Sequence, residues 1–256
     1  DEILKSKARI KTIIVKELKS IAEKYGQPRK SIIIYDDVAR YEEETVEIPD
    51  YPVNLFFTKE GYFKKITPQS LRMSGEQKLK DGDEIIQELE FTNNCDLLFF
   101  TDKCQVYKAK ADDFAQTKAS VLGDYVAAKL GFDEGENAVK MVVTKDYKGM
   151  LLFAFENGKA AKVPLESYAT KTNRKKLTGA YSDKSPLVGL LYLPEDEEVL
   201  FKASSGNMLL VHTGALALKT TRSTQGVAVL KPKKGHRLFS IERYKDCLLY
   251  TSDAAD

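Results

Sequence analysis

The chain has few of the residues from which active sites and disulfides are built. Among its 256 residues are two histidines, His212 and His236, and three cysteines. The cysteines form neither an even set nor a Cys-x-x-Cys pair, which favours reduced thiols over disulfides or zinc. No Ser-His-acid arrangement, phosphate-binding glycine loop or zinc-protease motif can be found. The sequence therefore gives no support to a catalytic or metal site.

Long apolar segments are also absent. The longest apolar runs, such as Met150–Phe155, are too short to span a bilayer, and no signal peptide opens the chain. Charged residues make up 30% of the chain and the apolar share is ordinary. We therefore expect a soluble globular protein of the cytoplasm, with no membrane partner.

What the chain does have is an internal repeat. A Leu-Phe doublet recurs at Leu55, Leu98, Leu152 and Leu200, with spacings of 43, 54 and 48 residues. Six residues after each leucine comes a turn position, held by Gly61, Cys104, Gly158 and Gly206. A second series, Gly75, Gly123, Gly179 and Gly226, has spacings of 48, 56 and 47 residues. Periods of this size are typical of four-stranded propeller blades.

Each unit reads as a β-hairpin. An apolar run meets a short turn, where glycine tolerates the positive φ that tight turns require. A second run then alternates, as in Tyr62–Ile66 and Gln105–Ala109, with the period of two that marks a half-buried strand. The predicted fold is all-β, a propeller-like array of four-stranded blades over residues 51–245. Residues 246–256 are then either a truncated fifth repeat or a foreign tail.

The first 50 residues differ from the array. Ile14, Leu18, Ile21 and Tyr25 form one apolar stripe of a predicted helix, which Gly26 and Pro28 end. The stripe suits packing either against another helix or against the helix's own domain. Residues 35–50 are an acidic linker, either a solvated segment or one that competes with nucleic acid for a basic surface.

Charge is distributed unevenly along the chain. Residues 41–140 contain 12 Lys and Arg against 20 Asp and Glu, whereas residues 161–245 contain 15 against 7. Such polarity is informative about partners, and it predicts that the second half binds a polyanion, of which nucleic acid is the commonest.

The candidate DNA contacts are of two kinds. Three lysines occupy the same place on the second hairpin strand of successive repeats, where the fourth repeat has Leu210, and could line one surface. Other basic residues are mixed with hydroxyl and amide side chains, which suits a phosphate backbone. The full set is Lys65, Lys108, Lys162, Lys171, Arg174, Lys175, Lys176, Lys184, Arg222, Lys231, Lys233, Lys234 and Arg237. Because no element for reading bases is visible, binding that depends on duplex shape and charge is expected.

Three stretches carry a resemblance to a known family. LKSIAEKYGQPRKSIII, LFFTKEGYFKKI and LLFFTDKCQVYKAKADDF resemble the A subunit of bacterial type IIA DNA topoisomerases, the group comprising DNA gyrase and topoisomerase IV. The similarity runs from about Leu18 to Lys245. It implies a β-pinwheel, a propeller-like array whose blades exchange strands and which binds and bends duplex DNA on a basic outer rim.

The resemblance also implies what surrounds the array. Residues 1–34 would be the end of the breakage-reunion region, with the last helix of its coiled-coil arm. The transesterifying tyrosine would lie upstream, so this chain would bind DNA without cleaving it. ATP and magnesium would belong to the holoenzyme, with no cofactor in this chain. The partners would be duplex DNA, the rest of the A subunit, and the ATPase subunit of an A2B2 heterotetramer, in the cytoplasm at the nucleoid.

One motif departs from the family. Gyrases carry a Gln-Arg-Arg-Gly-Gly-Lys-Gly box after the first hairpin, on which wrapping depends. The corresponding positions include Ser74, Gly75, Gln77, Lys78 and Lys80, with acidic residues among them. This degenerate box favours a topoisomerase IV-like or degenerate subunit. Two other functions remain open: a propeller scaffold that binds protein through an apolar face, and a propeller enzyme with polar residues at its central channel.

Overall fold

The computed structural model describes residues 6–27, 49–73, 76–170 and 175–244. The chain divides into two units, residues 1–47 and residues 48–256. The predicted boundary between residues 34 and 35, and the predicted segment 246–256, lie outside the described residues.

The first unit is a single helix, α1 (Lys7–Tyr25). The Ser6 side chain accepts a hydrogen bond from the Arg9 backbone N–H at 3.5 Å, which caps the helix start. The helix ends at the predicted residue, where the Gly26 N–H donates to the Ala22 carbonyl at 2.7 Å. A Cβ at Gly26 would lie 2.2 Å from that carbonyl oxygen, so this close approach requires glycine. The predicted stripe is exposed within the unit.

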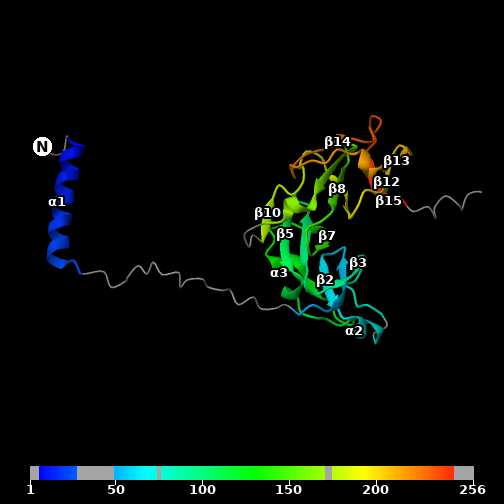
Figure 1. Ribbon diagram of the computed structural model, residues 1–256, viewed down its shortest axis with the longest axis horizontal. Coiled ribbons are helices and arrows are strands. Elements are labelled where there is room, and N and C mark those ends of the chain that lie inside the picture. Colours follow the sequence, from blue (N-terminus) through cyan, green and yellow to red (C-terminus); the bar gives the residue numbers. More distant parts are fainter. Residues whose placement is uncertain (1–5, 28–48, 74–75, 171–174, 245–256) are drawn as a thin grey trace, which may run out of the picture. The chain divides into compact units, whose positions relative to one another are not determined.

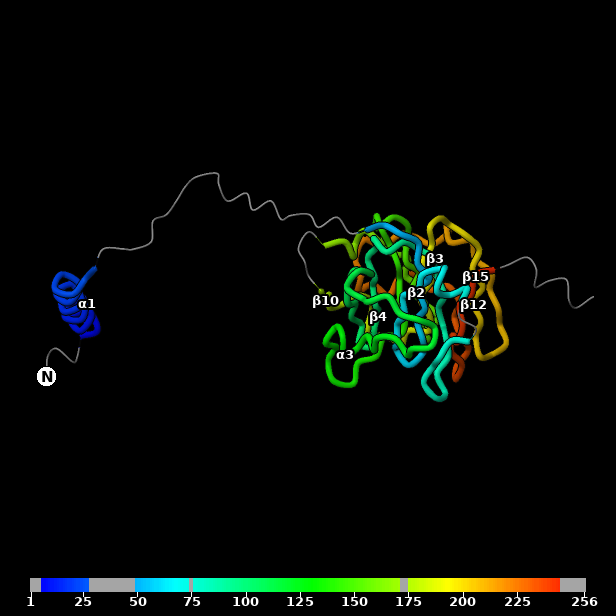
Figure 2. Tube along the Cα trace, turned by 90° about the horizontal axis from the view of Figure 1, so that it is seen from below, coloured from blue at the N-terminus to red at the C-terminus, as the bar shows by residue number. Residues whose placement is uncertain are grey.

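The second unit is built from four antiparallel sheets that follow one another around an arc (Figures 1 and 2). The sheet orders are β3-β1-β2-β6, β10-β5-β4-β7, β11-β8-β9-β14 and β13-β12-β15. The first blade contains β1 (Pro52–Thr58), β2 (Tyr62–Ile66), α2 (Pro68–Arg72) and β3 (Ile85–Thr92). The second contains β4 (Asp96–Thr101), β5 (Gln105–Lys110), η2 (Ala111–Asp113) and β7 (Ala138–Thr144). Between η2 and β7 in the sequence come β6 (Asp124–Tyr125), which belongs to the first sheet, and α3 (Val126–Leu130).

The later repeats follow the same plan. The third blade contains β8 (Met150–Phe155), β9 (Lys159–Pro164), η3 (Leu165–Tyr168) and β11 (Leu187–Leu193), with β10 (Lys176–Thr178) between η3 and β11. The fourth contains β12 (Glu198–Ala203), β13 (Met208–His212), η4 (Thr213–Ala215) and β15 (Leu238–Arg243), with β14 (Val227–Ala228) between η4 and β15. Three blades therefore have four strands, and the fourth has three among the described residues.

The blades exchange strands. After the hairpin of each later blade, the chain returns to the preceding blade and adds a short strand to its outer side: β6 pairs with β2, β10 with β5 and β14 with β9. We call these three returning stretches the crossovers; their described residues are 116–125, 169–170 with 175–178, and 218–228. The predicted propeller-like β-pinwheel, preceded by an α-helix, is confirmed.

The repeat residues form the core. The phenylalanines of the four doublets, Phe56, Phe99, Phe153 and Phe201, are all buried on the first hairpin strand of their blades. Phe99 and its neighbours Phe57, Phe63 and Phe114 pack with ring centroids 4.6–6.1 Å apart across the first two blades. Cys104 has φ +56, so the predicted turn position adopts the left-handed conformation even without glycine.

Candidate nucleic-acid interface

The three repeat lysines point into the protein. The Lys65 side chain is buried, at 2% exposure, and its ammonium donates to Asn93 Oδ1 at 2.6 Å and the Ala111 carbonyl at 2.7 Å. Lys162 is 5% exposed and donates to Asp196 Oδ1 at 2.9 Å and the Thr213 carbonyl at 2.7 Å. The expectation that these lysines line an accessible surface is therefore wrong.

Their burial follows from contacts with the next blade, whose acceptors surround each ammonium. The Lys65 and Lys162 backbones bridge in parallel to Gln116 and Leu218, so a crossover runs alongside the strand of each lysine. Because each ammonium reaches acceptors of the next blade, these lysines join neighbouring blades. The sequence pattern identified the repeat position correctly, but it could not show that the next blade supplies acceptors for the ammonium groups.

Lys108 occupies the corresponding place in the second blade and is half-buried. Its ammonium donates to Thr170 Oγ1 at 3.2 Å and lies 4.8 Å from the centre of the Tyr147 ring. Burial lowers the pKa of Lys108, and also that of Lys65. These ammonium groups are occupied by internal partners, which makes them poor candidates for phosphate contact.

Several of the predicted basic residues gather instead around the β8–β9 turn, residues 156–158. On one side, the Glu156 N–H donates to the Pro186 carbonyl at 3.0 Å, which brings Lys184 close to the turn. On the other side, the Leu230 N–H donates to the Gly158 carbonyl at 3.1 Å, which places Lys231 beside it. We call the following five residues the turn-end cluster: Lys184, Lys231, Lys233, Lys234 and Arg237.

The turn-end cluster carries excess positive charge. Its four lysines are exposed and have no ion pair within the part of the chain that the structure describes. Arg237 pairs with Glu156 at 3.2 Å, and Asp183 is the neighbouring carboxylate beside Lys184. Five cations therefore stand against two carboxylates. Residues from segments about 50 positions apart in the sequence thus form one basic surface, as an interface for a phosphate backbone requires.

Lys103 extends this end of the array and was not predicted from the sequence. It is exposed in the β4–β5 turn, where the Cys104 carbonyl accepts from the Ala180 N–H at 2.8 Å. The segment that begins at Ala180 then runs to the β8–β9 turn, so Lys103 and Lys184 lie at the same end of the strands. The signal was available, because Lys103 directly precedes the repeated turn position.

The basic residues of the second and third crossovers are partly engaged. Lys176 pairs with Asp133 at 2.6 Å and lies 5.3 Å from the Tyr107 ring centre. Arg222 donates to the Ser167 carbonyl at 3.4 Å and lies 5.8 Å from the Tyr168 ring. Lys175 is exposed, whereas the predicted contacts Lys171 and Arg174 lie outside the described residues.

The degenerate box lies at the outer side of the first blade. Ser74 and Gly75 are outside the described residues. The buried Lys64 ammonium donates to Gln77 Oε1 at 3.2 Å and to the Lys78 carbonyl at 2.6 Å, and the Lys78 N–H donates to the Ala119 carbonyl at 2.8 Å. These bonds attach the box segment to the first crossover. Lys80 pairs with Glu60 at 3.4 Å.

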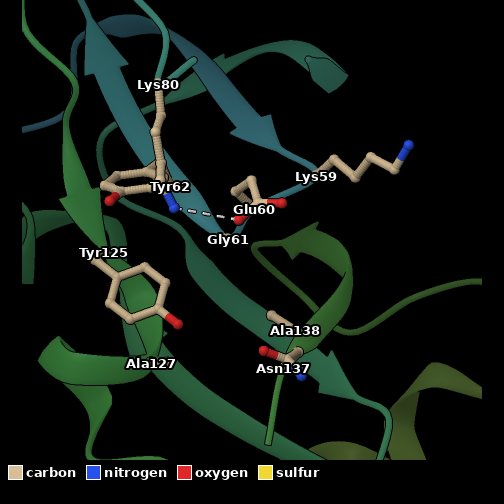
Figure 3. A pocket seen from close by; sticks show the side chains of 9 residues that line it. All are labelled: Lys59, Glu60, Gly61, Tyr62, Lys80, Tyr125, Ala127, Asn137 and Ala138. Carbon is tan, nitrogen blue, oxygen red and sulfur yellow. Dashed lines mark hydrogen bonds and ion pairs between the residues drawn. The ribbon is translucent and has the colours of Figure 1, made fainter. Parts of the chain in front are cut away.

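The β1–β2 turn of the first blade has a different charge balance from the β8–β9 turn. A cavity of about 540 Å³ beside it is lined by Lys59, Lys80, Tyr62 and Tyr125, among others (Figure 3). Lys59 pairs with Glu84 at 2.9 Å, and Lys80 with Glu60. Carboxylates therefore neutralise both lysines, which matches the acidic balance of the first half of the sequence.

Two general features bear on other functions. Within the described residues, no cluster of three or more His, Cys, Asp or Glu side chains could hold a metal ion. In the same part of the chain, no helix is both long and apolar enough to cross a membrane.

An array of four-stranded blades that exchange their outer strands defines the β-pinwheel class. Comparisons with known proteins agree with this class. Over 94% of its length the chain is 27% identical to the A subunit of DNA gyrase from Streptomyces coelicolor, and over 84% it is 26% identical to the A subunit of DNA topoisomerase 4 from Staphylococcus epidermidis. No family model matches the chain. The chain spans about 30% of the length of these relatives.

Solved structures give the same result for the fold. The C-terminal domain of DNA topoisomerase IV matches 77% of this chain and 62% of its own, with a TM-score of 0.67 and 24% identity. The C-terminal domain of DNA gyrase A matches 75% of this chain and 64% of its own, with a TM-score of 0.51 and 19% identity. The resemblance to the C-terminal domain of the A subunit of bacterial type IIA topoisomerases is thus confirmed.

Proposed function

We propose that the array is a DNA-binding and DNA-bending domain of the A subunit of a type IIA topoisomerase. The observation that carries this proposal is the turn-end cluster, in which exposed lysines from two distant segments surround one turn of a β-pinwheel. Its lysine ammonium groups are free of internal ion pairs among the described residues, whereas Lys162 pairs with Asp196 and the Lys65 ammonium is hydrogen-bonded inside the protein. Such groups can displace the counterions of a duplex, which supplies sequence-independent affinity.

The charge pattern also suggests where the duplex lies. In the first blade, Lys59 and Lys80 are neutralised by carboxylates, whereas the third-blade turn retains excess positive charge. A duplex bound to the array is therefore held mainly by the later blades. Contacts to successive blades around the arc favour a bent duplex over a straight one.

The rest of the proposal concerns the parent protein. Residues 1–34 would be the end of the breakage-reunion region, and the exposed stripe of α1 would pack in its coiled-coil arm. The parent would act in the cytoplasm at the nucleoid, would have the ATPase subunit for its partner, and would bind ATP and magnesium outside this chain. The array itself would contribute DNA binding without strand cleavage.

Charge reversal in the turn-end cluster tests the DNA-binding proposal. Lys231→Glu, Lys233→Glu and Lys234→Glu together should weaken binding to a linear duplex by about tenfold or more at low salt. The plot of log affinity against log salt has a negative slope, and this slope should become shallower by about 0.9 for each phosphate that is no longer neutralised. Fluorescence anisotropy with a labelled duplex at several salt concentrations measures both quantities.

A matched triple variant provides the control. Lys110, Lys145 and Lys148 lie at the opposite end of the strands, and changing them to Glu gives the same change in net charge. This control should retain most of the affinity. Equal weakening in the two triples would mean that only net charge matters, and absence of salt-dependent binding by the unmodified chain would remove the proposal.

The degenerate box leads to a separate prediction about wrapping. Because acidic residues interrupt the box, the chain should bend DNA while storing little writhe. Relaxed circular DNA that is nicked, bound by the chain and then ligated should show a linking-number shift close to zero. A strong positive shift would mean that the box is not required for wrapping in this protein.

A further inference from the structure

Each blade has a loop of the same kind just before its last strand. We call these segments, which precede β3, β7, β11 and β15, the entry loops: residues 80–84, 133–137, 182–186 and 233–237. In every blade the hairpin turn donates one backbone N–H to the last carbonyl of the entry loop: Lys59 to Glu84, Asp102 to Asn137, Glu156 to Pro186 and Ser204 to Arg237, at 2.8–3.0 Å. The entry loops therefore lie beside the hairpin turns, at equivalent places in the four blades.

Three of the entry loops contain the same β-turn. The N–H of the fourth turn residue donates to the carbonyl of the first: Asp83 to Lys80 at 3.0 Å, Glu136 to Asp133 at 3.1 Å and His236 to Lys233 at 2.9 Å. The third residue is a glycine with positive φ, as such a turn requires: Gly82, Gly135 and Gly235. The three turns read Lys-Asp-Gly-Asp, Asp-Glu-Gly-Glu and Lys-Lys-Gly-His. The backbone turn is thus kept, while its charge changes from negative in the first two blades to positive in the fourth.

We call the turn of the fourth blade, residues 233–236, the basic turn. All its residues are exposed, and its two lysine ammonium groups have no partner within the part of the chain that the structure describes. The turn is anchored at its base, where the Arg237 N–H donates to Ser204 Oγ at 3.0 Å. The His236 ring nitrogen Nδ1 lies 3.4 Å from the same hydroxyl. The basic turn therefore presents two neighbouring ammonium groups at the tip of a fixed backbone.

On the basis of the DNA binding proposed above, we propose that the basic turn enters the minor groove of the duplex and gives the array a preference for A·T base pairs. The ends of a β-turn are less than about 7 Å apart. This width suits a minor groove about 6 Å wide better than a major groove about 12 Å wide. A·T tracts narrow the minor groove and strengthen its negative potential, which attracts inserted lysine side chains.

Gly235 allows the turn to approach the bases closely. It has no side chain, and no protein atom lies within 4 Å of the place where a Cβ would be. The floor of the minor groove presents only acceptors at A·T pairs, whereas guanine adds its 2-amino donor at G·C pairs. Ammonium groups need acceptors, so A·T pairs suit the basic turn. The equivalent turns of the first two blades are acidic and are repelled by the duplex, which leaves the fourth blade to make this contact.

Binding of the full chain to three labelled duplexes of equal length tests the preference. Their central base pairs are A·T, G·C or inosine·C, and fluorescence anisotropy measures each affinity. The A·T duplex should bind at least about fivefold more tightly than the G·C duplex. Inosine lacks the 2-amino group of guanine but keeps its major-groove edge, so the inosine·C duplex should bind like the A·T duplex.

Two double variants locate the preference. Lys233→Ala with Lys234→Ala should bring the ratio of the A·T and G·C affinities close to one. Lys184→Ala with Lys231→Ala removes the same charge from other exposed positions of the turn-end cluster. This control should weaken binding to both duplexes and leave their ratio unchanged. Circular dichroism shows whether each variant remains folded.

The outcomes separate the groove contact from DNA binding itself. Equal affinity for all three duplexes overturns the groove contact and leaves the proposed function standing, whereas absence of binding to any duplex overturns both. An inosine·C duplex that binds like the G·C duplex would mean that the major groove is read, which also overturns the groove contact. The same holds if the variant of the basic turn keeps the preference, or if the control variant loses it.

Discussion

Replacing Gly158 by alanine is expected to destabilise the third blade strongly. Gly158 has φ +77, and a Cβ there would lie 1.7 Å from the Leu230 carbonyl oxygen and 2.7 Å from Pro232 Cδ. Left-handed backbone costs about 1–2 kcal/mol for a residue with a side chain. Separating the turn from Leu230 adds an overpacking cost of about 1–3 kcal/mol. Denaturant unfolding should show that the free energy of unfolding falls by about 2–5 kcal/mol, the sum of these two ranges.

Gly206→Ala is the matched control. Gly206 holds the same turn position in the fourth blade with φ +83, but no atom lies within 4 Å of the place where its Cβ would be. Only the backbone cost applies, so the free energy of unfolding should fall by about 1–2 kcal/mol. Equal destabilisation by the two substitutions would show that the close approach to Leu230 is unimportant.

The Gly158 variant should also affect DNA binding. The Leu230 and Val229 N–H groups both donate to the Gly158 carbonyl, at 3.1 and 3.0 Å, and this holds Lys231 at the turn. If the chain is displaced there, the lysines of the turn-end cluster no longer surround one site. Affinity for duplex measured below the unfolding temperature should fall in Gly158→Ala and remain near the unmodified value in Gly206→Ala.

The repeat made the fold predictable from the sequence. Leu-Phe doublets and turn positions are local signals, because a hairpin forms between neighbouring residues. They identified the first two strands of all four blades, and even Cys104 as a turn residue, which the structure finds in the left-handed conformation. The exchange of strands is non-local, and the sequence suggested it only through the family resemblance.

The distinction between local and non-local signals also explains why the repeat lysines are buried while the lysines of the turn-end cluster are exposed. Whether a lysine on a strand is exposed depends on which later segments pack against it, and the acceptors of the Lys65 ammonium, Asn93 and Ala111, lie 28 and 46 residues downstream. Lys231, Lys233 and Lys234 lie in a connecting segment and are exposed in the described chain, while their contact with DNA stays a prediction. Repetition of a charged residue at one position in a repeat array is thus as much a sign of blade-to-blade bonding as of ligand binding.

Lys65→Met is expected to reveal that bonding through a large decrease in stability. Methionine fills most of the same space but cannot donate to Asn93 Oδ1 or to the Ala111 carbonyl, both of which belong to the second blade. Hydrogen bonds from a charged donor contribute about 1.5–3 kcal/mol each, and the cost of burying the ammonium offsets part of this sum. Denaturant unfolding should therefore show a net decrease of about 2–4 kcal/mol.

The control for Lys65→Met is Lys110→Met, at the exposed end of β5. It removes the same charge without breaking a buried bond, so stability should change by less than about 0.5 kcal/mol. Hydrogen exchange locates the effect, because removal of the Lys65 bonds should speed exchange in the Asn93 turn and in η2 before it affects the third blade.

If Lys65→Met is as stable as Lys110→Met, the repeat lysines do not join the blades. Their regular spacing along the chain then needs a different explanation, such as a role in folding order. If only Lys65→Met is destabilised, the position that Leu210 holds in the fourth blade marks the place where blade-to-blade bonding by lysine stops.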